Sequence, residues 1–155
     1  MDKIIIKNKK ELENIIKNSP INSDLNNLDV SKIKDMSWLF YKSNFNGNIS
    51  KWNVSNVTNM ENMFAFSNFD QDISNWNTQN VKSMRSMFEG SKFNKDISNW
   101  NVSNVTDFSC IFEKSVFDQN ISKWDLTNAL MLDYMFDDSK ISKKIIIKKT
   151  LQYLE

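Results

Sequence analysis

The loop acids of this sequence are the side chains whose type and spacing come closest to a metal site. Asp70, Asp72, Asp96 and Asp118 recur at equivalent places in a repeated loop, and neighbouring carboxylates can bind Ca²⁺. Asn48 and Asn120 replace the second acid in two copies of the loop, and no calcium loop punctuated by glycine is present. Since Asp and Asn also close turns with their own backbone, the pattern favours turn formation, and we expect no metal.

Nucleophilic and acid–base chemistry lacks its usual residues. The chain contains no histidine, which removes the commonest general base and the commonest transition-metal ligand. Cys110 is the only cysteine, and it takes the place that Asn62, Ser86 and Tyr134 hold in equivalent stretches, so we expect a partly buried, unreactive thiol. The two glycines are too few for a phosphate-binding loop. We therefore predict that the chain is not an enzyme and uses no cofactor.

These residues sit in a sequence of 24 residues that the chain repeats five times. We divide the single domain, residues 1–155, into an N-terminal cap at 1–20, repeats at 21–44, 45–68, 69–92, 93–116 and 117–140, and a C-terminal cap at 141–155. A fixed period of this size, without insertions, is typical of units that bury their apolar faces by stacking on one another.

Within each repeat the apolar spacing changes from strand-like to helical. In the second repeat we expect a short strand at Trp52–Val54. The spacing of Val57, Met60, Met63 and Phe64, at i, i+3, i+6 and i+7, then predicts a helix of two to three turns. The predicted fold is accordingly α/β: a right-handed solenoid in which each unit is a short strand plus a short helix.

The caps and the core follow from the same patterns. Lys3–Lys7 predicts a strand, and Asn8 can cap a helix with Leu12, Ile15 and Ile16 on one face. The lysine-flanked run 143–149 predicts a closing strand. Equivalent Phe, Trp and Met residues of successive repeats are expected to stack in columns, with the tryptophan N–H groups bonded to neighbouring Asn, Ser or Asp side chains.

The outward side chains of the predicted strand are the candidate binding surface. Strand side chains alternate, so the residues around each inward tryptophan point to solvent. The predicted partner-binding residues are Asp29, Lys51, Asn53, Asn75, Asn77, Asn99, Asn101, Lys123 and Asp125. The same columns also fit a second interpretation, in which they are hydrogen-bonded ladders that set the stacking register.

Net charge and hydropathy exclude few classes of binding partner. With 20 basic and 19 acidic residues the net charge is +1, and the basic clusters lie at opposite ends of the chain, so nucleic acid is a weaker alternative to a protein partner. Self-association through the Ile-rich caps is another. No run approaches a membrane span, and no signal peptide is evident, which favours a cytoplasmic protein, or a surface or secreted one if a leader was removed.

The run Ile-Ser-x-Trp-Asn-Val-Ser-Asn-Val-Thr-x-Met-x-x-Met-Phe, at 49–64 and echoed at 73–88 and 97–112, resembles the BspA-like leucine-rich-repeat surface proteins of bacteria. The resemblance covers 21–140. It implies a leucine-rich-repeat-like solenoid that binds other macromolecules, commonly in adhesion. We therefore expect a non-catalytic protein-binding role. A narrower alternative is a small intracellular inhibitor or adaptor of a host-defence protein, encoded by a bacterial or phage mobile element.

Overall fold

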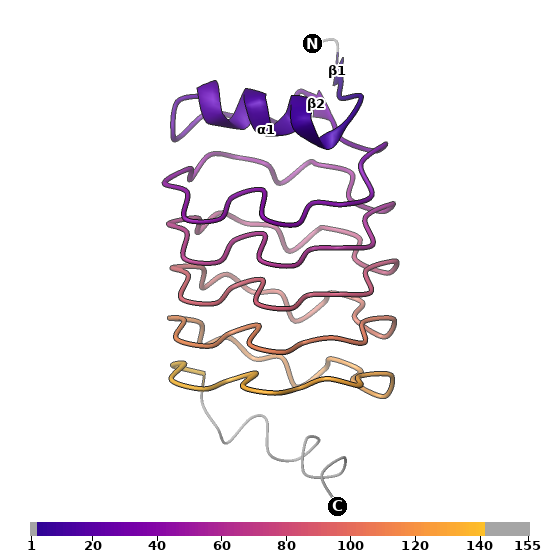
Figure 1. Cartoon of the computed structure of the whole chain (residues 1–155), viewed down its shortest axis with the longest axis vertical. Coiled ribbons are helices and arrows are strands. Elements are labelled where there is room, and N and C mark those ends of the chain that lie inside the picture. The colour runs from indigo at the N-terminus through magenta and orange to yellow at the C-terminus, as the bar shows by residue number, and fades with distance from the viewer. Residues whose placement is uncertain (1–2, 142–155) are drawn as a thin grey trace, which may run out of the picture.

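The computed structural model describes residues 3–141, which contain little regular secondary structure. The elements are strand β1 (Ile4–Ile5), helix α1 (Lys9–Asn18) and strand β2 (Leu28–Asp29), as Figure 1 shows. β1 and β2 pair in parallel, with Ile4 opposite Leu28. The rest of the described chain consists of turns, bends and isolated β-bridges.

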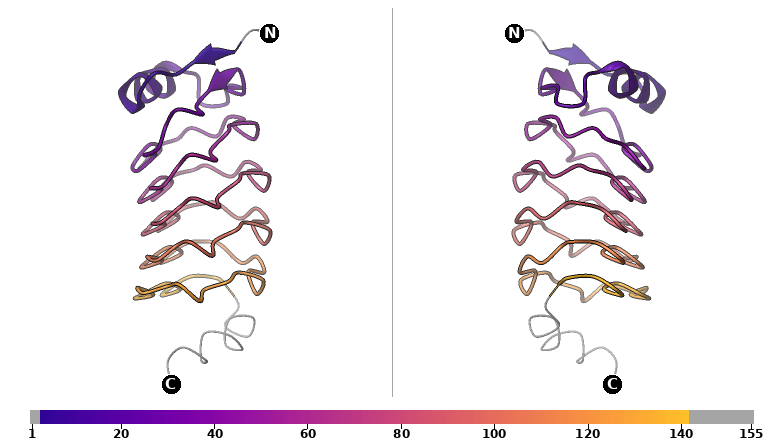
Figure 2. Two further views of the ribbon diagram at one scale, coloured as in Figure 1. Left: turned by 90° about the vertical axis from the view of Figure 1, so that its right-hand side faces the viewer. Right: turned by 90° about the vertical axis from the view of Figure 1, so that its left-hand side faces the viewer.

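The predicted α/β fold is therefore wrong. No repeat contains an α-helix within the described residues, and the strand expected at Trp52–Val54 is absent. A right-handed, leucine-rich-repeat-like solenoid of strand-plus-helix units is not what the chain forms. What the repeats form instead is a set of irregular windings, one for each 24 residues, which lie over one another along the long axis (Figures 1 and 2).

We number the windings 1 to 5, from residues 21–44 to 117–140, and the positions in each from 1 to 24. Equivalent residues of neighbouring windings pair at position 15. The parallel bridges there join Asp35 to Asn59, Asn59 to Ser83, Ser83 to Asp107 and Asp107 to Met131. Most bridges between windings thus fall on the stretch where we predicted a helix, and one further bridge joins Asp24 to Asn48 at position 4.

Positions 16 to 22 form a backbone ladder between windings in place of the helix. In winding 2 the N–H groups at the even positions donate to carbonyls of winding 3 at 2.7–3.0 Å: Met60 to Ser83, Asn62 to Arg85, Phe64 to Met87 and Phe66 to Glu89. Positions 18 and 22 have positive φ, between 51° and 63°. A helix needs negative φ throughout and keeps its N–H groups for its own carbonyls, so this ladder and a helix exclude each other.

Stacked columns of large side chains fill the core, as the sequence predicts. The rings of Trp52 and Trp76 lie 6.5 Å apart between centroids and nearly parallel, at 1°, and Trp76 and Trp100 repeat the arrangement at 6.4 Å and 3°. Phe64 and Phe88 stack likewise at 5.7 Å. All five are buried. Burying one such side chain contributes about 1.5–3 kcal/mol, so these columns are the main stabilising interaction.

The indole N–H groups find a different partner from the predicted one. Each donates to the backbone carbonyl at position 5 of the preceding winding, at 2.9–3.2 Å: Trp52 to Leu25, Trp76 to Ile49, Trp100 to Ile73 and Trp124 to Ile97. No side-chain acceptor is involved. This bond ties each of these four tryptophans to the winding before it and satisfies a buried donor.

The N-terminal cap matches its prediction. Asn8 caps α1 by accepting a hydrogen bond from the Glu11 N–H at 3.0 Å. The helix buries Leu12 and Ile16, and Ile15 packs against the same core. Lys9 reaches winding 1, donating to the Ser37 hydroxyl at 2.9 Å and to Asp35 at 3.3 Å. The predicted closing strand at 143–149 lies outside the described residues.

Candidate functional site

The residues predicted to bind a partner lie at positions 7 and 9 of the windings, and we call them the polar columns. Their side chains are exposed, except for that of Asp29, which is half-buried. They alternate with the side chains at positions 8 and 10, which are buried except for the half-buried Leu126, even though no strand forms there beyond β2. The structure therefore places these residues at the surface as expected, for a reason other than the predicted strand.

Hydrogen-bonded turns fix the column at position 9. The side-chain oxygen of each residue accepts the backbone N–H two residues later, at 3.0–3.2 Å: Asp29 from Ser31, Asn53 from Ser55, Asn77 from Gln79, Asn101 from Ser103 and Asp125 from Thr127. Asn and Asp form such turns readily. Hydrogen bonds from Ser31 hold the pKa of Asp29 below its usual value. The oxygen at position 9 thus has a structural task.

Position 12 adds the ladder that links the windings on this side. Its asparagine amide donates to the position 11 carbonyl of the preceding winding at 2.7–2.8 Å: Asn56 to Ser31, Asn80 to Ser55, Asn104 to Gln79 and Asn128 to Ser103. Side-chain amides here replace the backbone bonds of a regular sheet. A register-setting ladder of polar side chains is therefore present at position 12, a column that the prediction did not name.

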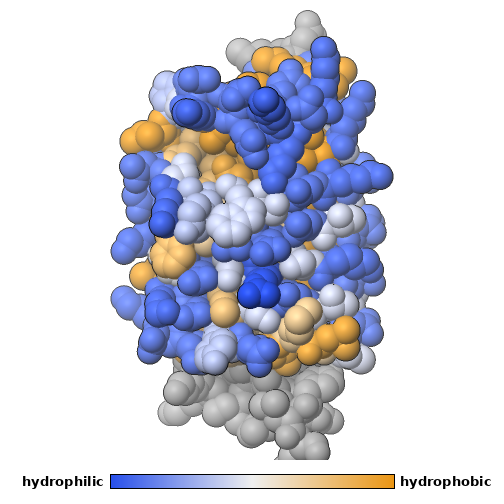
Figure 3. Space-filling model, in the orientation of Figure 1, coloured by the Kyte–Doolittle hydropathy of each residue, from blue (hydrophilic) through white to orange (hydrophobic). Residues whose placement is uncertain are grey.

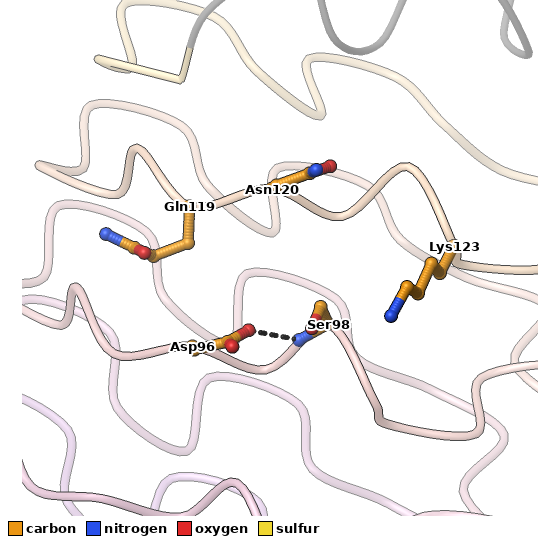
Figure 4. Close-up of a pocket in the computed structure, with 5 residues that line it drawn as sticks. All are labelled: Asp96, Ser98, Gln119, Asn120 and Lys123. Carbon is orange, nitrogen blue, oxygen red and sulfur yellow. Dashed lines mark hydrogen bonds between the residues drawn. The ribbon is translucent and has the colours of Figure 1, made fainter.

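A shallow hollow of about 220 Å³ opens beside the polar columns between windings 4 and 5. Figure 4 shows Asp96 and Ser98 on one winding and Gln119, Asn120 and Lys123 on the next, with the Lys123 side chain extending toward the first. The Ser98 N–H donates to Asp96 at 2.8 Å, and this bond, with the nearby Lys123 charge, lowers the pKa of Asp96. Enclosed ligand sites are usually larger, at ~300–1,000 Å³, so this hollow fits one protruding side chain better than a substrate.

The loop acids close turns and bind other windings. Asp72 and Asp96 accept the N–H groups of Ser74 and Ser98, while Asp70 accepts that of Asn94 at 2.8 Å and pairs with Lys95 at 3.0 Å. Within residues 3–141 no group of three or more His, Cys, Asp or Glu is arranged to hold a metal ion. The turn interpretation is confirmed for Asp72 and Asp96, whereas Asp70 joins two windings.

Cys110 lies half-buried at position 18 of winding 4. Burial, with a hydrogen bond between its thiol and the Glu113 carboxylate, raises the pKa of the thiol to about 11. Glu113 also pairs with Lys114. A nucleophilic cysteine needs a lowered pKa, so this environment is the opposite of an activating one.

Sequence reasoning missed a group of exposed aromatic side chains on the ladder, because it assigned the aromatic residues to the core. Trp38 is 49% exposed, Phe66 43% and Tyr134 64%. Trp38 meets Tyr41 edge-on at 4.8 Å between ring centroids, and Tyr41 meets Phe66 at 6.1 Å. Figure 3 shows that pale and orange groups interrupt the blue hydrophilic surface on the side it displays. The sequence contained one indication of this exposure: Trp38, Phe66 and Tyr134 occupy positions that hold Asn, Ser or Gly in other repeats.

The repeats of this chain match a known protein family. The chain matches a family described as "Mycoplasma protein of unknown function, DUF285" over residues 10–92 and again over 65–149. The chain belongs to the DUF285 family. Two overlapping matches indicate that DUF285 describes a repetitive sequence, in agreement with the tandem windings. The resemblance to BspA-like surface proteins is not confirmed, and neither a curated protein nor a solved structure gives a significant match.

The length and apolarity of its helices decide whether a chain can cross a membrane as a helical span. No helix within residues 3–141 has the length and apolarity that a bilayer span requires.

Proposed function

We propose that this DUF285 protein is a non-catalytic binding protein that docks a protein partner on its polar columns. The observation that supports this most directly is the fixed geometry of position 9. In Asn53, Asn77 and Asn101 the side-chain oxygen is held by the turn, and the side chains are exposed at the same position of three successive windings. A preorganised surface loses little side-chain entropy on binding.

The columns also carry a charge pattern that suits selective docking. Asn75, Asn77, Asn99 and Asn101 make the centre neutral, and the charged residues stand at the two ends, with Asp29 and Lys51 at one and Lys123 and Asp125 at the other. Amides in the centre offer donors and acceptors to peptide groups, while charges at the rim set register and partner choice.

The hollow beside Lys123 deepens one end of this surface. It lies between Asp96 and Lys123, so it presents both a carboxylate and an ammonium group to an entering side chain. Elsewhere on winding 4, the pKa of the Cys110 thiol is raised to about 11, so this thiol is not an activated nucleophile.

The test uses a substitution that changes the surface and leaves the turn intact. Asn77→Asp with Asn101→Asp keeps the turn oxygen, as Asp29 and Asp125 already do, but replaces two amide donors by carboxylates. The matched control is Thr58→Lys, an exposed change at position 14 that copies Lys34 and Lys82 of neighbouring windings.

A partner is first isolated by cross-linking pull-down and identified by mass spectrometry, and its affinity is then measured by titration calorimetry. We expect the double variant to bind at least about tenfold more weakly and the control to bind like the native chain. Equal affinities for all three proteins, or turnover of a substrate without any recovered partner, would refute the proposal.

A further inference from the structure

Strand β1 has one edge without a backbone partner, at the N-terminal end of the stack, where it is the outermost described strand (Figures 1 and 2). The Ile4 N–H donates to the Asn27 carbonyl at 2.8 Å. The Ile6 N–H donates to the Asp29 carbonyl at 3.0 Å. Because neighbouring residues of a strand direct their backbone groups to opposite edges, the N–H and C=O groups of Ile5 face away from β2. Neither group bonds to another described residue, so Ile5 presents one donor and one acceptor to a further strand.

The side chains at this edge are apolar and exposed, and lysines flank them. Ile4 is 50% exposed and Ile5 54%, whereas Ile6 is buried. Lys3 and Lys7 are both exposed. Side chains alternate along a strand, so Lys3, Ile5 and Lys7 share the solvent face, and Ile4 lies on the core face. An exposed apolar edge with free backbone groups is a template for pairing with another extended segment.

We propose that β1 binds an extended acidic segment of a protein partner, which adds to the sheet as a strand outside β1. The backbone of the segment bonds to the Ile5 N–H and C=O groups, and its β-branched side chains cover Ile4 and Ile5. Two carboxylates of the segment, four residues apart, pair with Lys3 and Lys7. In this mode of recognition main-chain hydrogen bonds supply affinity, and alternate side chains supply specificity.

The charges of the edge favour an acidic segment. Neighbouring strands are about 4.8 Å apart, so an added strand lies about 4.8 Å from β1 and about 9.6 Å from β2. Lys3 and Lys7 flank β1 in the nearer row. Asp29 belongs to the farther row, and its side-chain oxygen accepts the Ser31 N–H. Glu11 accepts the Lys7 N–H at 2.7 Å, which ends the free edge on that side.

A second copy of β1 does not fit this edge. An antiparallel pair centred on Ile5 sets Lys3 opposite Lys7 at both ends, and a parallel pair in register sets each lysine opposite itself. Like charges directly opposite each other destabilise a strand pair. The two lysines therefore prevent pairing between copies of the chain, while they leave the edge open to an acidic segment.

The probe is the peptide acetyl-Ser-Glu-Val-Ile-Val-Glu-Ser-amide, whose glutamates are four residues apart. A matched peptide has lysine in place of both glutamates. NMR titration of the full, ¹⁵N-labelled chain gives the two dissociation constants. We expect the acidic peptide to bind with a dissociation constant below about 1 mM, and the lysine peptide at least about tenfold more weakly. In the complex the Ile5 amide should exchange its hydrogen at least about tenfold more slowly, because it gains a hydrogen bond.

Three variants assign the binding to β1. Lys3→Glu with Lys7→Glu should reverse the preference, so that the lysine peptide binds more tightly than the acidic one. Ile5→Pro removes an N–H that makes no bond to β2, which an edge strand tolerates, and should weaken the acidic peptide about fivefold. Lys92→Glu with Lys140→Glu, two exposed lysines at position 24, makes the same change in net charge and should bind like the native chain.

Four outcomes would overturn the proposal: no saturable binding up to about 1 mM, equal affinity for the two peptides, unchanged hydrogen exchange of the Ile5 amide in the complex, or an unaltered preference in the variant with both Lys3→Glu and Lys7→Glu. Circular dichroism of each variant establishes that it folds, and the peptide comparison on the native chain depends on no variant. The Asn77 and Asn101 variant leaves β1 intact and should bind the acidic peptide like the native chain. Failure of this proposal is therefore distinguishable from failure of docking on the polar columns.

Discussion

Replacing Phe88 by alanine tests whether stacked rings hold the windings together. Phe88 has no exposed surface and lies between Phe64 and Phe112, at 5.7 and 5.8 Å between ring centroids, with Phe93 at 4.4 Å. Because neighbouring windings are tied to each other by the ladder, the site cannot close around the lost ring. We expect a loss of about 3–5 kcal/mol in the free energy of unfolding, the usual range for a buried phenylalanine.

The same column supplies the control. Phe136 holds the equivalent place in winding 5, stacks on Phe112 at 6.2 Å between ring centroids, and is only partly buried. Phe136→Ala should therefore cost about 1–2 kcal/mol. Urea unfolding followed by tryptophan fluorescence measures both. Equal losses in the two variants, or a loss below about 1 kcal/mol for Phe88→Ala, would show that stacking along the core is not the main stabilising interaction.

Three further predictions concern single residues. Gly90→Ala should destabilise the chain by about 1–3 kcal/mol, because a Cβ there would lie 2.5 Å from the Phe66 ring. The loss of stability should be smaller when Phe66 is also replaced by alanine, and a double-mutant cycle of urea unfolding measures this difference. Alkylation of Cys110 by iodoacetamide should rise with pH toward a midpoint near 11 in the folded chain and near ~8.5 in urea, and a common midpoint would contradict the burial of the thiol. Backbone hydrogen bonds lower the folded-state pKa of Asp72 and Asp96. The stability that these carboxylates contribute is therefore present above the unfolded-state pKa of about 3.9 and is lost as the pH falls through the folded-state pKa. In acid titrations followed by fluorescence, the Asp96→Asn variant should lose less stability than the native chain does.

The sequence predicts the period, the columns and the N-terminal cap because each depends on local or strictly repeated signals. Trp52 and Trp76 are 24 residues apart and stack, and any fold that superimposes successive repeats would bring them together. Asn8 likewise caps α1 through a bond three residues away. The outward placement of positions 7 and 9 follows from the buried tryptophan between them and needs no strand.

The helix prediction failed because two backbone conformations share one apolar spacing. Met60, Met63 and Phe64 point inward both in a helix and in the observed ladder, so periodicity alone cannot separate the two. The difference lies in φ at positions 18 and 22. Non-glycine residues there adopt the left-handed region at a cost of roughly 1–2 kcal/mol each, which the ladder hydrogen bonds offset. Asn62 and Gly90, residue types that favour positive φ, were the available sign.

A comparison of positions 9 and 18 indicates which side chains can change the binding surface without changing the fold. Position 9 holds only Asn or Asp, since its oxygen must close the turn, so substitution there is limited to exchanging an amide for a carboxylate. Position 18 holds Trp, Asn, Ser, Cys and Tyr, because its structural task belongs to the backbone N–H and carbonyl and not to the side chain. A repeat of this design can therefore vary its side chain at position 18 while position 9 stays nearly constant. On the polar side, position 7 holds Asn in three windings and Lys in two, so its side chain can change the charge of that surface without affecting the turn at position 9.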